Sequence, residues 1–219
     1  MTTTDDDIQT GAARACGWAL TAAAIVSVAT MLYHPSVGGR GMDAVREIAS
    51  ESLVANLVHA IMMLALGALL VGFTGLSAAL GWRSFTSRAA YVAYAIGGAT
   101  MFGAATVNGF AINRVARAFL AAGSTDVAIV RDQIATLGAL SSTWAQSGAA
   151  AQGVAFALWA FALWPHARGL AALGGLAAVP ALAAGFGVLP LNVHGYLLVV
   201  VAQAMWTVAV GVQLIRGRL

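Results

Sequence analysis

Six apolar stretches, each about 20 residues or longer, follow one another along the chain and constrain its fold more than any other feature. They cover residues 14–33, 53–81, 88–112, 138–164, 169–189 and 193–215. A helix needs about 20 apolar residues to cross a hydrocarbon core of about 30 Å. The stretches are too long for the strands of a membrane β-barrel and lack their alternation of apolar and polar residues. The sequence therefore predicts an all-α integral membrane protein, a compact bundle of six transmembrane helices.

The scarcity of charge supports a membrane location and excludes several other classes of protein. Only 9% of the residues are charged, against about 25% in soluble domains, so much of the surface must face a lipid bilayer. All eleven basic residues are Arg. They lie between the apolar stretches or at their ends and form no basic stripe, so we expect no nucleic-acid partner. Without lysine, the chain cannot form a Schiff base or a P-loop phosphate site.

The distribution of Arg predicts how the bundle lies in the membrane. Six crossings place both chain ends on one side. The connections on that side are short and carry Arg without acidic residues, whereas Arg on the other side is interleaved with Asp and Glu. By the positive-inside rule both termini are cytoplasmic. We expect a multi-pass protein of a bacterial-type inner (plasma) membrane, with residues 1–12 as a disordered tail and 13–219 as one domain.

Two connections, 34–52 and 113–137, are long and are predicted to lie outside the membrane. In the first, acidic residues recur at every fourth position, Asp43, Glu47 and Glu51, which favours a short amphipathic helix at the surface. The second connection joins the third span, predicted to end at residue 112, to the fourth, predicted to begin at residue 138.

Three histidines fall at one depth if the helices cross as predicted. Counted from the Arg at the inner end of each span, His34, His59 and His194 lie at heights of about 30 Å, about 36 Å and about 33 Å, at a rise of about 1.5 Å per residue. His166 lies at the opposite end of its span. The first three histidines therefore form a layer near the outer face.

Other polar residues gather at the same outer end of the spans. Ser52, Asn56 and His59 share one helical face because they are spaced four and three residues apart. Polar groups inside a membrane are costly and usually face the bundle interior or a wet cavity. The sequence therefore predicts a polar vestibule that opens outward. Its candidate ligand-binding residues are Glu51, Asn56, His59, Asn108, Arg114, Arg117 and Gln146.

The histidine layer has three interpretations. Imidazoles from His34, His59 and His194 with an open fourth position would suit zinc or copper. Two of them facing each other could ligate a haem, although the chain lacks close spacings such as H-x-x-x-H. The plainest interpretation is that amphipathic side chains lie at the level of the lipid headgroups.

Three functions follow and stay open at this point. The protein binds or transports a small ligand in the vestibule; or it is a membrane oxidoreductase that uses haem or a transition metal; or it is an accessory subunit whose glycine-rich helices pack against a membrane-protein partner or a second copy. Whether it is an enzyme is not determined by the sequence.

Overall fold

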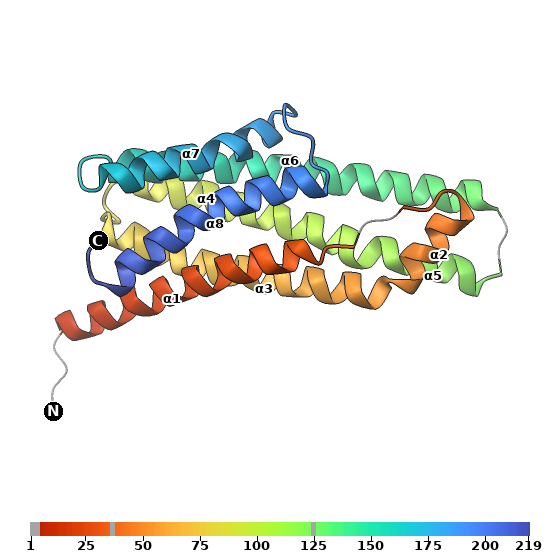
Figure 1. Ribbon diagram of the computed structural model, residues 1–219, viewed down its shortest axis with the longest axis horizontal. Helices are drawn as coiled ribbons and strands as arrows, with labels where there is room; N and C mark the ends of the chain where they lie inside the picture. The colour runs from red at the N-terminus through yellow and green to blue at the C-terminus, as the bar shows by residue number, and fades with distance from the viewer. Residues whose placement is uncertain (1–4, 36–37, 124–125) are drawn as a thin grey trace.

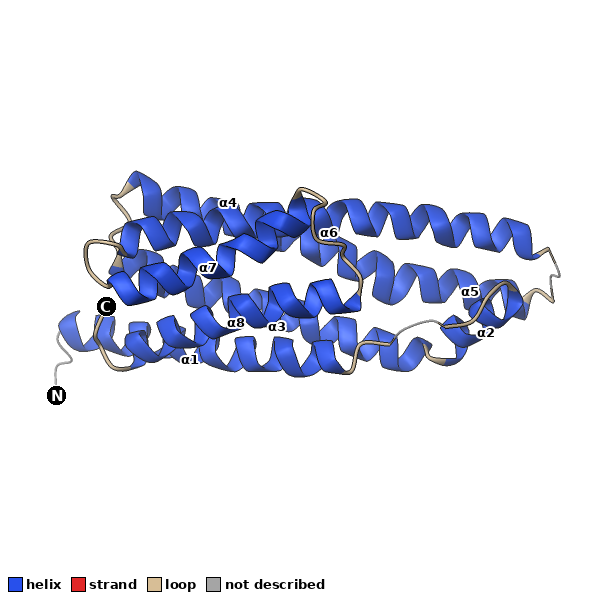
Figure 2. Ribbon diagram, turned by 45° about the horizontal axis from the view of Figure 1, so that its top comes forward, coloured by secondary structure: helices blue, strands red, loops and turns tan. Residues whose placement is uncertain are grey.

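The computed structural model describes residues 5–35, 38–123 and 126–219, which form a bundle of long helices (Figure 1). In chain order these are α1 (Asp5–Leu32), α2 (Met42–Ser50), α3 (Ser52–Ala79), α4 (Phe85–Thr106), η1 (Val107–Ala111), α5 (Ile112–Ala121), α6 (Val127–Leu163), α7 (Arg168–Gly185) and α8 (Val193–Ile215). The described residues contain no β-strand, as Figure 2 also shows. The predicted all-α class is confirmed.

Five helical segments are long and apolar enough to cross a membrane, which suggests a multi-pass membrane protein. They are Thr10–Leu32, Ser52–Ala79, Phe85–Ala121, Arg168–Gly185 and Val193–Ile215. Each overlaps one of the predicted spans. The remaining predicted span, 138–164, covers the second part of α6 and one residue beyond it. Helix α6 is not among the five because polar residues such as Gln146 and Gln152 interrupt its apolar sequence. The sixth crossing stays a prediction.

The long connection 113–137 is mostly helical, because both neighbouring helices continue past the predicted ends of the spans at 112 and 138. Helix α5 continues to Ala121 and α6 already begins at Val127. The continuous helix Phe85–Ala121 and α6 each contain 37 residues, a length of about 55 Å. Both helices therefore extend well beyond a hydrocarbon core of about 30 Å.

A second, small core explains why this extension is helical. The predicted amphipathic helix in the connection 34–52 is confirmed as α2. It lies against α5 at one end of the bundle (Figure 1). Val45 of α2, Ala116 of α5 and Val130 of α6 are buried together. Amphipathic helices that cover each other in this way need little hydrophobicity, so the span pattern does not detect them.

Helix α1 begins and helix α8 ends at the opposite end of the bundle (Figure 1). An even number of crossings would place them so. Helix α1 begins at Asp5, inside the stretch that we predicted as a tail, and residues 1–4 of that stretch lie outside the described residues.

A cluster of five aromatic side chains holds four of the helices together. Phe73 of α3 stacks on Trp159 of α6 with ring centroids 4.5 Å apart, and it meets the edge of Tyr94 of α4 at the same distance. Trp206 of α8 packs against Phe156 of α6 at 4.7 Å. We call these five residues the aromatic core. Such pairs contribute about 0.5–1.5 kcal/mol each beyond the area they bury.

Glycines allow two pairs of helices to approach closely. A Cβ atom on Gly97 of α4 would lie 2.9 Å from the carbonyl oxygen of Gly148 in α6, and a Cβ on Gly148 would lie 3.0 Å from that of Gly97. Gly17 of α1 meets Gly211 of α8 in the same manner, with a Cβ-to-oxygen distance of 2.5 Å. Helix association in lipid depends on such close packing, because no hydrophobic force drives it.

Candidate ligand-binding cavity

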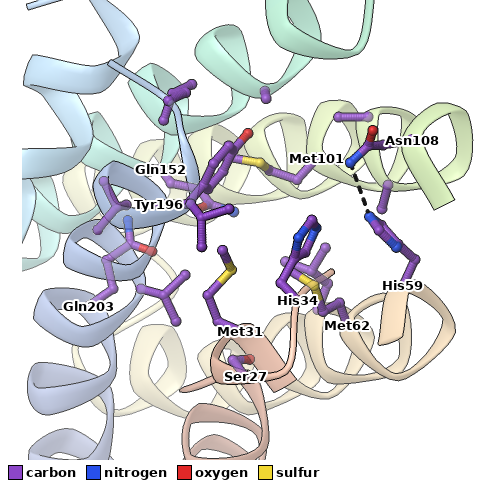
Figure 3. A pocket seen from close by; sticks show the side chains of 18 of the residues that line it. Ser27, Met31, His34, His59, Met62, Met101, Asn108, Gln152, Tyr196 and Gln203 are labelled. Atoms are coloured by element: carbon purple, nitrogen blue, oxygen red, sulfur yellow. Dashed lines mark hydrogen bonds between the residues drawn. The ribbon is translucent and has the colours of Figure 1, made fainter. Parts of the chain in front are cut away.

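A cavity of about 520 Å³ lies between α1, α3, α4, α6 and α8, and Figure 3 shows it from close by. Tyr94 and Phe156 belong both to its lining and to the aromatic core, so the aromatic core forms part of the cavity wall. Its lining also includes the exposed residues Asn108, Ser142 and Asn192, which mark a mouth. The volume is in the range of small-molecule sites.

The lining is apolar with neutral hydrogen-bonding groups set into it. None of the described residues that line the cavity is Asp, Glu or Arg. Met31, Met62, Leu66 and Phe156 are among its apolar residues. The polar side chains include His34, His59, Asn108, Gln152, Gln203 and Thr207. An unpaired charge in such surroundings would be costly, so the cavity suits an uncharged molecule.

His59 of α3 is held in a defined orientation. Its Nδ1 lies 2.7 Å from the carbonyl oxygen of Ala55. Because a carbonyl oxygen can only accept, Nδ1 carries the proton and donates it, which leaves Nε2 of the neutral ring as an acceptor. Asn108 donates a hydrogen bond from its Nδ2 to this acceptor, over a distance of 3.3 Å (Figure 3).

The π-helical turn η1 brings Asn108 to His59. Such turns inside α-helices are rare and are often found at functional sites. Gly109 of η1 lies against the ring of His59, where an added Cβ would collide with it. Only a residue without a side chain allows this approach, so Gly109 and His59 together fix the position of Asn108.

His34 follows α1 and presents an unused acceptor to the cavity. Its ring meets the edge of the His59 ring, with centroids 5.0 Å apart (Figure 3). Nδ1 lies 2.9 Å from the carbonyl oxygen of Pro35 and therefore donates to it. Nε2 of the neutral ring is left as an acceptor and has no partner among the described residues.

Burial lowers the pKa of His34 below its ordinary value of 6.5, although the hydrogen bond to Pro35 partly opposes the shift. In the unfolded chain this imidazole binds a proton at higher pH than in the folded protein. The contribution of His34 to stability is therefore complete above pH 6.5 and is lost as the pH falls from 6.5 through the folded pKa.

We expect the free energy of unfolding in detergent micelles to decrease with acidification below pH 6.5, and to decrease less in His34→Gln. His59, the imidazole in contact with His34, is kept in both proteins, so the difference between the two profiles reports on His34. Parallel profiles from about pH 8 to about pH 5 would contradict the assignment.

Two glutamines inside the bundle line the cavity. Nε2 of Gln203 is buried and has no hydrogen-bond partner among the described residues. Leaving such a donor unsatisfied costs about 1–3 kcal/mol. Gln152 is only 4% exposed and lines the same cavity (Figure 3). A bound molecule with an oxygen acceptor would satisfy the Nε2 donor of Gln203.

The structure brings together some of the predicted ligand-binding residues. His59 and Asn108 line the cavity. Asn56 lies outside the lining and hydrogen-bonds to the side-chain amide of Asn113 at 3.0 Å. The others are outside the lining as well: Glu51 and Gln146 are half-buried, and Arg114 and Arg117 are exposed.

The donor set does not fit a haem or a three-histidine metal site. His194 is exposed and does not line the cavity. The described residues contain no group of three His, Cys, Asp or Glu that could hold a metal ion. Bis-imidazole ligation of haem requires two nitrogens directed at one iron, but Nε2 of His59 is directed at Asn108 and its ring is in edge contact with His34.

The sequence analysis missed several lining residues, among them Met31, Tyr94, Gln152, Tyr196 and Gln203. Gln152 and Gln203 carried a usable signal, because an amide inside an apolar helix needs a partner.

The fold and the cavity define the class of protein: a helical, multi-pass membrane protein with an internal cavity. Comparisons with protein-family models, curated proteins and solved structures gave no match.

Proposed function

We propose that this protein binds a small, uncharged, largely apolar molecule that carries a hydroxyl or carbonyl group. One observation carries the proposal: a cavity of ligand size inside the bundle combines unused neutral hydrogen-bonding groups with an apolar lining that contains no charged side chain among the described residues. The redox alternative lacks a suitable donor set, and no observation specifically favours an accessory subunit.

The polar groups indicate how the ligand would be held. Nε2 of His34 would accept a hydrogen bond from a hydroxyl group, since Nδ1 already donates to Pro35. Nε2 of Gln203 would donate to an oxygen of the ligand. The Met and Leu side chains would contact the apolar part. Among the described residues no Arg lines the cavity, so an anionic ligand would lack a cationic partner there.

The proposal includes six crossings, with α6 as the additional one and with both termini in the cytoplasm of a bacterial-type cell. Two observations support the sixth crossing. Phe156 and Trp159 of α6 are buried in the aromatic core, beside helices that are long and apolar enough to cross. In addition, α1 begins and α8 ends at the same end of the bundle, as an even number of crossings requires (Figure 1).

Binding of matched ligands to the full chain in phosphatidylcholine nanodiscs tests the function. We expect tritiated decanol to bind above the background of empty nanodiscs, and decanoate and decylammonium to bind much more weakly because their charges would lose hydration without gaining a partner. His34→Ala should weaken decanol binding by about threefold to tenfold, the value of one hydrogen bond.

His194→Ala is the matched control, because His194 is exposed and outside the cavity lining. It should bind decanol as the unmodified protein does. Equal binding of decanol, decanoate and decylammonium would contradict the proposal. So would an equal loss of decanol binding in the two histidine variants.

A further inference from the structure

A second hollow lies on the outside of the bundle, between α1 and α8. We call it the α1–α8 groove and define it by Ile25, Val28, Ala29, Leu32, Val201 and Met205. Its volume is about 610 Å³, and every described residue that lines it is apolar. Ile25, Leu32 and Met205 are 58%, 65% and 60% exposed. In a membrane this surface faces acyl chains.

The groove and the internal cavity share a thin wall. Ala24 of α1 and Ala204 of α8 line both of them, so the side chains at this point are single methyl groups. Nearer the chain ends the same two helices are in backbone contact at Gly17 and Gly211. They lie farther apart where α1 ends and α8 begins (Figure 1). The seam between α1 and α8 is therefore closed at one end and thin in the middle.

Polar groups lie directly inside this wall. Gln203, the neighbour of Ala204, lines the cavity but not the groove, and its Nε2 is the buried donor without a partner. Ser27, one turn after Ala24, also lines the cavity and donates its proton to the carbonyl of Ala23 at 2.8 Å, so its oxygen can still accept. A hydroxyl group that passed the wall would meet both.

We infer that the cavity opens sideways into the bilayer through the α1–α8 groove, and that its ligand is a long-chain lipid with an uncharged hydroxyl or carbonyl head. The head occupies the cavity and the chain lies in the groove. The inference rests on the proposed function, and it adds the chemical class of the ligand and its route of entry. A ligand dissolved in the membrane needs no passage through water.

Alcohols with long and short alkyl chains test this inference separately from the proposed function. Ala29→Phe fills the groove without touching the cavity lining, and Ala22→Phe places the same side chain at an exposed position of α1 outside both. In phosphatidylcholine nanodiscs we expect Ala29→Phe to weaken binding of tritiated octadecanol by about tenfold and to leave tritiated hexanol unaffected, because the short chain fits inside the cavity. Ala22→Phe should change neither.

Each other outcome is decisive. If Ala29→Phe binds octadecanol as tightly as the unmodified protein while hexanol still binds, the lateral opening is wrong and the proposed function stands. If hexanol does not bind to the unmodified protein, both fall. Octadecanol with a diazirine at the end of its chain gives a readout that needs no variant: labelling within the α1–α8 groove supports the inference, and labelling at Asn108 or Asn192 overturns it.

Discussion

Replacing Phe73 with Ala is expected to lower the free energy of unfolding by about 3–5 kcal/mol, the range for a fully buried large aromatic residue. Phe73 is completely buried and has Tyr94, Phe156, Trp159 and Trp206 as ring neighbours. The loss would come from packing, because the helices are already out of water in a membrane and dispersion contacts are what the vacated space removes. Reversible unfolding in mixed micelles measures it.

Phe161→Ala is the control for this experiment. Phe161 lies on α6, as Phe156 does, but is 72% exposed on the outer surface of the bundle. When the Phe161 ring is removed, lipid can fill the space beside α6. We therefore expect the free energy of unfolding to change by no more than about 0.5 kcal/mol. Similar losses for the two variants would show that the aromatic core does not hold the bundle together.

The spans could be predicted because the bilayer sets their length. Helix α8 runs over the predicted residues 193–215, and α3 begins and ends within two residues of its predicted span. The extension formed by α5 and the first part of α6 could not be predicted in this way. Its stability comes from contacts between Val45, Ala116 and Val130, which lie far apart in the sequence and therefore leave no continuous apolar pattern.

The height of the histidines along the helices could be predicted, but the side of each helix that faces the cavity could not. The rise per residue placed His34, His59 and His194 at one height, and the rings of His34 and His59 are indeed in contact. His194 is exposed and lies outside the cavity lining. Height along a helix follows from counting residues, but the side that faces the interior follows from an amphipathic pattern. Where nearly all residues are apolar, that pattern is weak.

Filling the cavity should have the largest effect on function. Ala145 of α6 is 3% exposed and lies in the lining between Ser142 and Gln152. We expect Ala145→Phe to abolish decanol binding in nanodiscs, because the added ring would take the space of the ligand. The free energy of unfolding should fall by no more than about 1–3 kcal/mol, the usual cost of overpacking, because the new side chain enters the cavity.

The matched control is Ala139→Phe, an exposed position on the same helix and outside the lining. It should leave both binding and the free energy of unfolding unchanged, so that the comparison isolates the effect of occupied volume. Decanol binding that persists in Ala145→Phe would place the ligand elsewhere on the protein. Binding lost in Ala145→Phe and kept in Ala139→Phe, with both proteins folded, would identify the interior of the bundle as the site, because α6 presents the two residues to different surroundings.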